Sequence, residues 1–464
     1  MSEEVEPMQG PVLAGAATER ARLAAKDCVH CGFCLPACPT YQLWGEEMDS
    51  PRGRIHLATQ LLDGAPLTAA AAEHFDRCLG CMACMTACPS GVQYDQIIEA
   101  AREWTEEADE TSGPAGAPGG PEAAVSGSTG TWAGRSPAER LTRAAIFSVF
   151  PYPARLRLAI APLRLAQRAG ADRLISRSGL LGKISPAAEQ ALRLAPPAAR
   201  PLPPGRFPSR IPARGERRAV VGMLTGCVQS VFFPQVNAAT ARVLAAEGCD
   251  VIVPRSQGCC GALSLHSGRA AEAAAFARKT IETFETASVD AIIVNSAGCG
   301  SAMKEYERLL ADEPEWATRA AALSSRVRDF AEYLDALGAV ATRHPVPVRA
   351  AYHDACHLGH AQRVTAAPRA LLRGVPGLEL AELRDAGVCC GSAGVYNLLQ
   401  PEAARALGER KADAVAASGA SLLISGNPGC TLQIAAVLAE RGSSLRAVHT
   451  AEILDASING ARLG

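Results

Sequence analysis

Short apolar runs bounded by turn residues recur in the second half of the chain, and they predict buried strands. The runs are AVVGML (219–224), AIIVN (291–295), VRAAYHDA (348–355) and SLLISG (421–426). Apolar residues at helical spacing separate them, as in 237–247 and 403–417. Strands that alternate with helices predict two small α/β units, each built on a parallel sheet.

The first half of the chain is organised differently. From about Thr105 to Ser136 it is rich in Gly, Ala, Pro, Ser and Glu, which predicts disorder because such a segment cannot bury a core. Residues 137–195 place Leu, Ile and Ala between Arg residues at helical spacing, and they predict a helical connector that leads into the Pro-rich segment APPAARPLPPGRFP. We therefore expect four regions along the chain. These are residues 1–104, 105–216, 217–340 and 341–464.

Composition and charge limit the function. The 464 residues are 48% hydrophobic, and the chain is long enough for about three globular units. The net charge of -1 shows no excess of basic residues, so nothing indicates nucleic-acid binding. Seventeen cysteines in a long chain that begins without a positively charged, apolar leader predict a reduced, cytoplasmic compartment. The most apolar stretch, 144–165, is broken by Pro and Arg, so we expect no transmembrane segment. Any membrane attachment is expected to be peripheral, on the inner face of the cell membrane, or through a partner.

Two cysteine runs with identical spacing carry the strongest chemical signal. Each reads C-x2-C-x2-C-x3-C-P, and close spacing lets one loop hold three corners of a cubane iron-sulfur cluster through soft, anionic thiolates. The fourth cysteine, just before proline, usually ligates the other cluster. We therefore predict two 4Fe-4S clusters. The first is assigned to Cys28, Cys31, Cys34 and Cys88, and the second to Cys78, Cys81, Cys84 and Cys38.

The residues between these cysteines support the same interpretation. Zinc ribbons also contain C-x2-C pairs, but they use four ligands in two pairs rather than two runs of four. The small residues Gly32, Gly80 and Ala83 let backbone N–H groups approach the sulfurs. The 39 residues that separate the two runs include a helical pattern from about 51 to 63. We therefore expect a helical domain rather than a minimal ferredoxin.

The two α/β units repeat a second cysteine pattern. Each has one cysteine, then Cys-Cys-Gly about thirty residues later, then another cysteine about forty residues further on. The sets are Cys227, Cys259, Cys260 and Cys299, and Cys356, Cys389, Cys390 and Cys430. They follow predicted strands, whose carboxyl ends gather ligands in open α/β sheets, so each set is expected to converge. A redox or third-cluster role and a role as buried thiols in tight turns are both open.

Other residues carry weaker signals. Cys249 has no counterpart and is predicted to be an ordinary buried thiol. The Arg52-Gly53-Arg54 run is expected on a solvated helix face. Histidines in α/β turns are more often hydrogen-bonded structure than ligands. Those near the second cysteine pattern are His266, His353, His357 and His360. No GxGxxG, P-loop or Ser/His/Asp pattern occurs at a convincing position, so we assign no catalytic residue and no flavin site to this chain.

These motifs resemble two known families. The second pattern resembles the cysteine-rich CCG domain of heterodisulfide-reductase-type proteins, although the fullest form of that motif ends in C-x2-C and this chain has Ser296 and Asn427 at the first of those positions. The segments CVHCGFCLPACPTYQLWGEEMDSPRGRIHLATQLLDG and DRCLGCMACMTACPSGVQY are similar to the iron-sulfur subunit of glycolate oxidase, also called glycolate dehydrogenase. That resemblance covers roughly residues 20–104 and 217–455, and it leaves the connector as an insertion.

The resemblance implies an α+β multidomain fold: an N-terminal helical ferredoxin-like domain with two 4Fe-4S clusters, followed by two α/β CCG repeats. It implies that FAD-containing glycolate oxidase subunits oxidise glycolate to glyoxylate, and that this chain passes their electrons to a quinone or another acceptor. Relatives of the same architecture leave alternatives open: the iron-sulfur subunit of a lactate or glycerol-3-phosphate dehydrogenase, or a heterodisulfide-reductase-like thiol reductase. The absent thiols at Ser296 and Asn427 argue against the last. A zinc-stabilised scaffold would contain zinc and no acid-labile sulfide.

Overall fold

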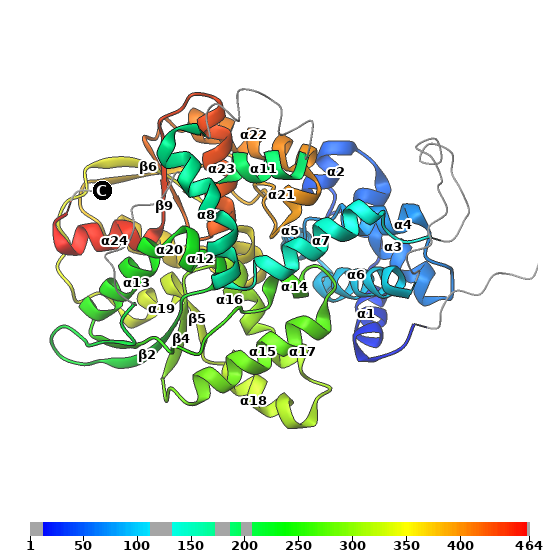
Figure 1. Cartoon of the computed structure of the whole chain (residues 1–464), viewed down its shortest axis with the longest axis horizontal. Coiled ribbons are helices and arrows are strands. Elements are labelled where there is room, and N and C mark those ends of the chain that lie inside the picture. The colour runs from blue at the N-terminus through cyan, green and yellow to red at the C-terminus, as the bar shows by residue number, and fades with distance from the viewer. Residues whose placement is uncertain (1–12, 112–131, 172–185, 196–206, 462–464) are drawn as a thin grey trace, which may run out of the picture. The chain divides into compact units, whose positions relative to one another are not determined.

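The computed structural model describes residues 13–111, 132–171, 186–195 and 207–461. The chain divides into two compact units (Figure 1). The first consists of Met1–Ala145 and Ser264–Ala270, and the second of Ile146–Leu263 and Ala271–Gly464. Within the described ranges, no helix has the length and apolar character that a membrane crossing requires. The four region boundaries expected from the sequence stay a prediction.

Helices make up the regular structure described for the N-terminal part of the chain. They are α1 (Ala16–Lys26), α2 (Pro39–Trp44), the short 3-10 helix η1 (Glu47–Asp49), α3 (Pro51–Leu62), α4 (Ala69–Asp76), α5 (Ala83–Ala87) and α6 (Tyr94–Thr111). Helix α3 begins where the Ser50 hydroxyl accepts a hydrogen bond from the Gly53 N–H at 3.0 Å and Pro51 occupies the first turn. The prediction of a helical domain is therefore confirmed.

Helix α6 corrects one prediction. Disorder was expected from Thr105, but α6 continues to Thr111 because its buried face packs against α1. The indole N–H of Trp104 donates to Thr18 of α1 at 3.1 Å, and Thr105 is buried. Residues 112–131 of the predicted disordered segment lie outside the described residues.

The predicted helical connector is confirmed where it is described. Its helices are α7 (Pro137–Val149), α8 (Pro153–Ala169) and α11 (Pro186–Leu194). The Pro-rich segment that follows lies mostly outside the described residues.

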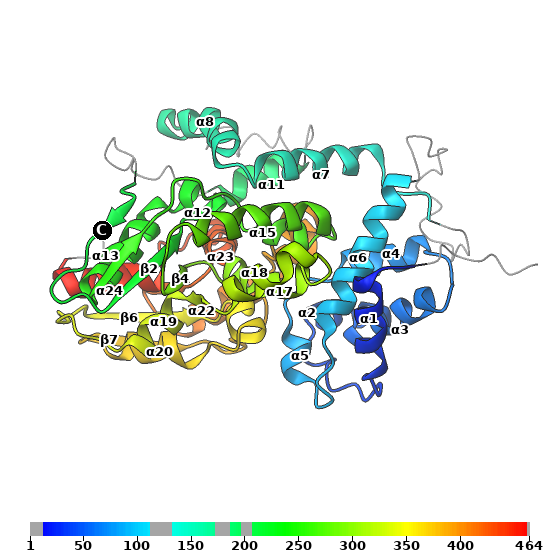
Figure 2. The ribbon, with the colours of Figure 1, turned by 90° about the horizontal axis from the view of Figure 1, so that it is seen from below.

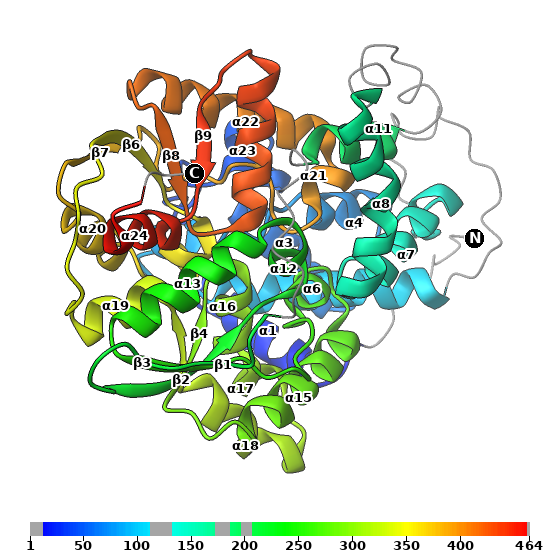
Figure 3. The same cartoon turned by 60° about the vertical axis from the view of Figure 1, so that its left-hand side comes forward.

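Two parallel sheets form the core of the second unit (Figure 3). The first module, residues 210–337, has the strand order β1 (Arg210–Ile211), β3 (Cys249–Ile252), β2 (Ala219–Leu224), β4 (Ala291–Val294) and β5 (Val327–Asp329). Only β1 runs antiparallel to its neighbour. Cys249 is the first residue of β3 and is fully buried, as predicted. The helices of this module are α12 (Cys227–Phe232), α13 (Pro234–Ala246), α14 (Ala262–Leu265), α15 (Ala270–Glu285), α16 (Ala297–Lys304), α17 (Tyr306–Leu309), α18 (Pro314–Ser324) and α19 (Phe330–Leu337).

The second module, residues 348–459, repeats this plan with four parallel strands. Their order is β7 (Leu378–Glu382), β6 (Val348–His353), β8 (Leu422–Ser425) and β9 (Arg446–Val448). The helices are the π-helical turn η3 (His357–Ala361), α20 (Ala366–Arg373), α21 (Tyr396–Leu399), α22 (Pro401–Ala417), α23 (Pro428–Glu440) and α24 (Thr450–Asn459). The predicted strands and helices of both α/β units are thus confirmed.

The two modules share one hydrophobic core. Helix α13 packs against α24, and α19 packs against α20 (Figure 2). Buried side chains of both sheets join the same cluster, including Val221 and Met223 of β2 and Tyr352 and Ile424 of β6 and β8. Burial of these apolar surfaces holds the strand ends of one module in a fixed position relative to those of the other.

Candidate functional site

The two N-terminal cysteine runs fold into loops with the same backbone path. In the first loop His30 and Gly32 have left-handed φ angles of 53° and 84°, and in the second Gly80 and Met82 have φ angles of 61° and 60°. Such residues turn backbone N–H groups toward the inside of a loop. The Gly80 N–H lies 3.4 Å from the Cys78 sulfur. Each run can therefore wrap an anionic group with its own amides.

Four cysteines that are distant in sequence meet at one cavity. Cys28, Cys31 and Cys34 of the first run line it together with Cys88 of the second, and Cys84 also borders it. Cys31 is exposed, whereas Cys28, Cys34 and Cys88 are partly buried. The structure thus brings together the four residues that the sequence assigns to the first cluster.

The four residues assigned to the second cluster are also close together. Cys38, Cys78, Cys81 and Cys84 are all buried. Burial raises the pKa of Cys84 well above its usual value, and the neighbouring thiols of Cys81, Cys78 and Cys38 raise it further. Thiols that repel one another's charge in this way form a compact all-sulfur donor set, the type that iron-sulfur clusters use. Ligation by these eight cysteines stays a prediction.

A buried arginine lies beside the second set of thiols. Arg54 is 1% exposed, and it donates hydrogen bonds to the His74 carbonyl at 2.6 Å, to the Thr40 hydroxyl at 3.1 Å and to the Asp49 carboxylate at 3.0 Å. The same Thr40 hydroxyl lies 3.2 Å from the Cys38 sulfur. The guanidinium group is therefore separated from a predicted cluster ligand by one side chain.

This arginine favours negative charge on the sulfur of Cys78. Burial by itself opposes ionisation, yet the pKa of Cys78 is lowered, because Arg54 and Arg102 attract the thiolate and the Gly80 N–H and the Tyr94 hydroxyl hydrogen-bond to it. Burial opposes the charge of Arg54 too, but Cys78, Tyr94 and other neighbours raise its pKa. The second site thus combines burial with compensating positive charge.

The expectation of a solvated helix face at Arg52-Gly53-Arg54 was wrong for Arg54. Helix α3 turns that side chain inward, and only Arg52 remains near the surface, where it pairs with Glu47 at 2.5 Å. Gly53 permits this packing, because a Cβ there would lie 2.0 Å from the Glu47 carbonyl oxygen. Arg102 and Tyr94, on α6, were also missed, because spacing within a motif carries no information about a helix that packs over it.

The second cysteine pattern converges within each module. In the first module the sulfurs of Cys227 and Cys259 are 3.6 Å apart, and the hydrogen-bonded row continues through Cys260 to Cys299. In the second module the same row runs through Cys356, Cys389, Cys390 and Cys430. Their role as redox or metal ligands stays a prediction.

A tight glycine turn shapes each Cys-Cys-Gly segment. Gly261 and Gly391 have φ angles of 81° and 89°, and an added Cβ would lie 3.0 Å and 2.5 Å from the carbonyl oxygens of Ala273 and Ala404. Only glycine fits such a close approach in that conformation. The turn presents both adjacent thiols to the interior of the module.

The positions that lack cysteine hold the two modules together. The Ser296 hydroxyl lies 3.4 Å from the Asn427 side-chain oxygen, which also accepts a hydrogen bond from the Gly298 N–H at 3.4 Å. The Asn427 amide donates to the Cys430 sulfur at 3.4 Å. Both residues therefore act as hydrogen-bonding side chains between the modules, where a thiolate would instead add charge.

The histidines divide into two kinds. His360 follows the prediction of a structural role, since its Nε2 lies 2.8 Å from the Gly387 carbonyl oxygen, and His266 lies 3.4 Å from Glu99. His353 contradicts it, because this residue is buried and neither ring nitrogen has a hydrogen-bond partner among the described residues.

Comparison with known families matches these sites. A "4Fe-4S dicluster domain" model matches residues 24–92, and a "Cysteine-rich domain" model of the CCG type matches 221–304 and 350–435. A third model, described as "Glycolate oxidase iron-sulfur subunit, linker region", matches 138–195. The resemblance thus extends into the connector, which sequence analysis left as an insertion.

Two relatives align over most of the chain, and a third aligns over about half of it. The "Probable glycolate oxidase iron-sulfur subunit" of Bacillus subtilis is 35% identical over 92% of this chain and 93% of its own length. The "Glycolate oxidase iron-sulfur subunit" of Escherichia coli is 34% identical over 88% of this chain and 89% of its own length. "Lactate utilization protein A" of Shouchella clausii is 34% identical but covers 51% of this chain and 98% of its own length.

Proposed function

Because the chain belongs to the family of glycolate oxidase iron-sulfur subunits, we propose that it is the electron-transfer subunit of a glycolate dehydrogenase complex. FAD-containing partner subunits oxidise glycolate to glyoxylate, and this chain carries the electrons to a quinone or another acceptor. It works in the cytoplasm or at the inner face of the cell membrane. Two 4Fe-4S clusters, when bound, supply one-electron transfer, and the residues of the chain hold and tune them.

The observation that carries this proposal is the exchange of cysteines between the two N-terminal loops. Cys88 of the second run lines the same cavity as Cys28, Cys31 and Cys34. Ligand exchange of this kind keeps two clusters close together, which fast electron transfer needs. Zinc ribbons do not require it, because each ion is held by two local pairs.

The first cluster site is the edge at which electrons enter or leave the chain. Its ligand Cys31 is exposed, and the neighbouring side chains Val29 and Phe33 are 69% and 68% exposed. The second set, by contrast, is buried, so a partner reaches it only through the chain. Exposed apolar side chains around a redox centre give a partner protein a surface on which to dock.

Two findings favour glycolate over lactate. The connector matches a model described as the linker region of the glycolate oxidase iron-sulfur subunit, and the two relatives with that subunit name align over most of the chain. The lactate-utilisation relative covers only about half of it. The substrate is chosen by the flavoprotein partner, so this preference rests on family membership alone.

The thiol-reductase alternative is less well supported. A thiol that attacks a disulfide needs a low pKa and access to its substrate. Here a neighbouring thiol and burial raise the pKa of Cys299 and of Cys356 well above the usual value. Replacing Cys259 or Cys389 by Ser would abolish turnover if the protein were a disulfide reductase, and it would leave glycolate-dependent reduction of the N-terminal clusters intact under our proposal.

The test is anaerobic purification with the flavoprotein partner, followed by iron and sulfide analysis and by electron paramagnetic resonance during reduction. Iron for two 4Fe-4S clusters and signals that appear with glycolate are expected. Cys28→Ser and Cys88→Ser should remove the same signal, although 59 residues separate the two positions. Signals that appear only with lactate would refute the glycolate assignment, and absence of iron and sulfide would refute the electron-transfer role.

A further inference from the structure

One imidazole in the second module is buried without a hydrogen-bond partner in the part of the chain that the structure describes. His353 ends strand β6 and is 1% exposed. Among the described residues, neither its Nδ1 nor its Nε2 has a partner. Leaving a buried polar group unpaired costs about 1 to 3 kcal/mol. A bound metal ion would remove that cost, since neutral imidazole is a common metal ligand.

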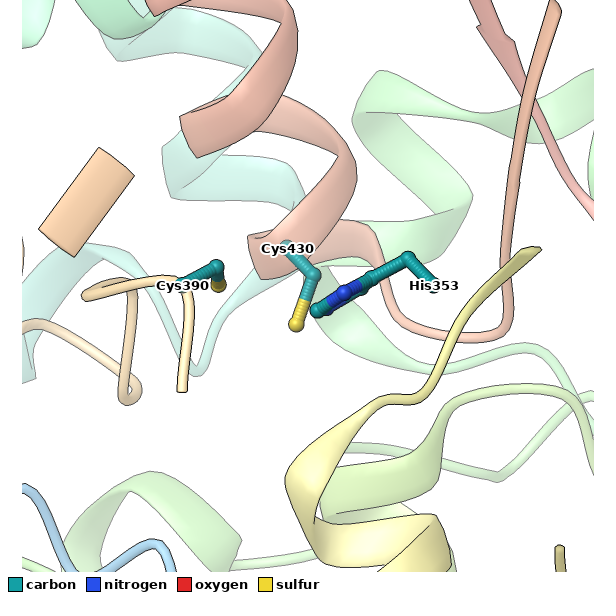
Figure 4. Close-up of side chains that lie close together, drawn as sticks. All are labelled: His353, Cys390 and Cys430. Atoms are coloured by element: carbon teal, nitrogen blue, oxygen red, sulfur yellow. The ribbon is translucent and has the colours of Figure 1, made fainter. Parts of the chain in front are cut away.

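Two thiols lie beside this ring. Cys390 directly precedes the turn glycine Gly391 in the segment that follows β7, and Cys430 lies in the first turn of α23. Figure 4 shows the Cys430 sulfur next to the ring of His353. One donor atom from each of the three residues lies within 4.8 Å of the other two. The next thiol in the row, Cys389, hydrogen-bonds to Cys390. One nitrogen and three sulfur donors are thus available in one buried place.

The first module has no imidazole at the corresponding position. His353 stands three residues before Cys356, and Leu224 stands three residues before Cys227, each at the end of the first long strand of its module. The two rows of thiols are otherwise alike. The difference is therefore specific to the second module and does not come from the shared fold.

A positive charge distinguishes the second module as well. Lys411 lies seven residues after Ala404, and Thr280 lies seven residues after Ala273, the two alanines whose carbonyl groups face the Cys-Cys-Gly glycines. Lys411 is 3% exposed, and its ammonium group donates to the Asp385 carbonyl at 2.7 Å. A neutral hydroxyl in one module is thus replaced by a buried cation in the other.

We propose that His353, Cys390 and Cys430, with Cys389 as the fourth ligand, bind a single zinc ion in the second module. Around a tetrahedral zinc ion, nitrogen at about 2.0 Å and sulfur at about 2.3 Å place the donors roughly 3.5 to 3.8 Å apart. The donors of His353, Cys390 and Cys430 already lie within 4.8 Å of one another and reach this arrangement by small side-chain rotations. Cys389 joins them through its hydrogen bond to Cys390. An iron-sulfur cubane would hold each thiolate on a different iron and therefore farther apart.

The charges balance at such a site. Three thiolates and one neutral imidazole around a divalent ion leave one negative charge, and the three thiol protons are released on binding. Burial lowers the pKa of Lys411, while the nearby thiols of Cys390, Cys389 and Cys430 raise it, so the ammonium group lies where it can compensate that charge. The site is independent of the N-terminal clusters and of the substrate of the complex.

The test measures metals in the full-length chain purified without oxygen. Wild type is expected to contain one zinc ion in addition to the iron of the N-terminal clusters. His353→Leu copies the leucine that the first module carries, so it should fold, keep its iron and lose zinc affinity at least tenfold in competition with a chelator. His353→Cys should restore zinc binding, and with cobalt in place of zinc it should strengthen the sulfur-to-cobalt charge-transfer absorption.

Matched variants separate a ligand role from a packing role. Cys430→Ser should also lose zinc, whereas Cys249→Ser, which removes a fully buried thiol elsewhere in the same unit, should keep it. Wild-type protein that binds no added zinc would overturn the proposal. Unchanged zinc affinity in His353→Leu would overturn it as well. So would a Cys430→Ser variant that loses iron and sulfide instead of zinc.

Discussion

Removing the charge of Arg54 should lower the reduction potential of the second cluster. A positive charge near a cluster stabilises the reduced state, which carries one more electron. The hydrogen bonds through Thr40 place the guanidinium group within about 6 Å of the Cys38 sulfur. The substitution Arg54→Gln removes that charge and keeps a side chain that can donate hydrogen bonds.

The magnitude follows from Coulomb's law. At an effective dielectric constant of about 20 and a separation of roughly 6 to 10 Å, a unit charge contributes about 2 to 3 kcal/mol. Asp49, whose carboxylate lies 3.0 Å from the guanidinium group, offsets about half of this. The remainder of about 1 kcal/mol corresponds to a potential lower by roughly 40 to 60 mV for a one-electron couple.

The measurement is a redox titration of the purified chain followed by electron paramagnetic resonance. Arg54→Lys is the matched control, since it keeps the charge but loses the planar set of hydrogen bonds. Its potential should stay within about 20 mV of wild type if charge is the cause. An equal fall in both variants, or an unchanged potential in Arg54→Gln with full iron content, would refute the electrostatic explanation.

Three further predictions concern the modules and the docking edge. Gly391→Ala should lower the free energy of unfolding, measured by urea denaturation, by about 1 to 3 kcal/mol. The φ angle there is 89°, and the new Cβ would lie 2.5 Å from the Ala404 carbonyl oxygen. The control Gly258→Ala, whose Cβ would meet nothing within 4 Å, should change the free energy of unfolding little. Burial lowers the pKa of His449 from 6.5 to about 4. Between these pH values the unfolded chain binds a proton at this residue and the folded chain does not. The free energy of unfolding therefore falls by up to about 3 kcal/mol as the pH is lowered from 6.5 to about 4. His449→Asn keeps a capping acceptor without titrating, and its urea midpoint should therefore depend less on pH; an unchanged dependence would contradict this sign. Phe33→Asp should slow electron transfer with the flavoprotein partner at least tenfold in stopped-flow measurements without shifting either cluster potential, and an unchanged rate would exclude this edge as the docking surface.

The candidate donor residues could be identified from sequence because the motifs that contain them depend on local spacing. The C-x2-C-x2-C-x3-C-P runs and the Cys-Cys-Gly repeats contain the candidate donor atoms themselves. The apolar runs at 219–224 and 348–353 identify strands of parallel sheets, which are covered on both faces. The family comparisons agree with these motifs. The predicted disorder failed at Thr105–Thr111, because composition ignores the neighbour that buries a helix face.

Only the tertiary structure decided which polar residues surround those sulfurs. Arg54 lies in a charged run that is typical of a solvated helix face, and it is buried because α3 packs toward Asp49 and Thr40. His353 ends a strand like Leu224, and its unpaired ring matters only because Cys390 and Cys430 arrive from residues far along the chain. Burial, charge compensation and ligand geometry depend on contacts between distant segments, and a single sequence does not specify which of its polar residues will meet.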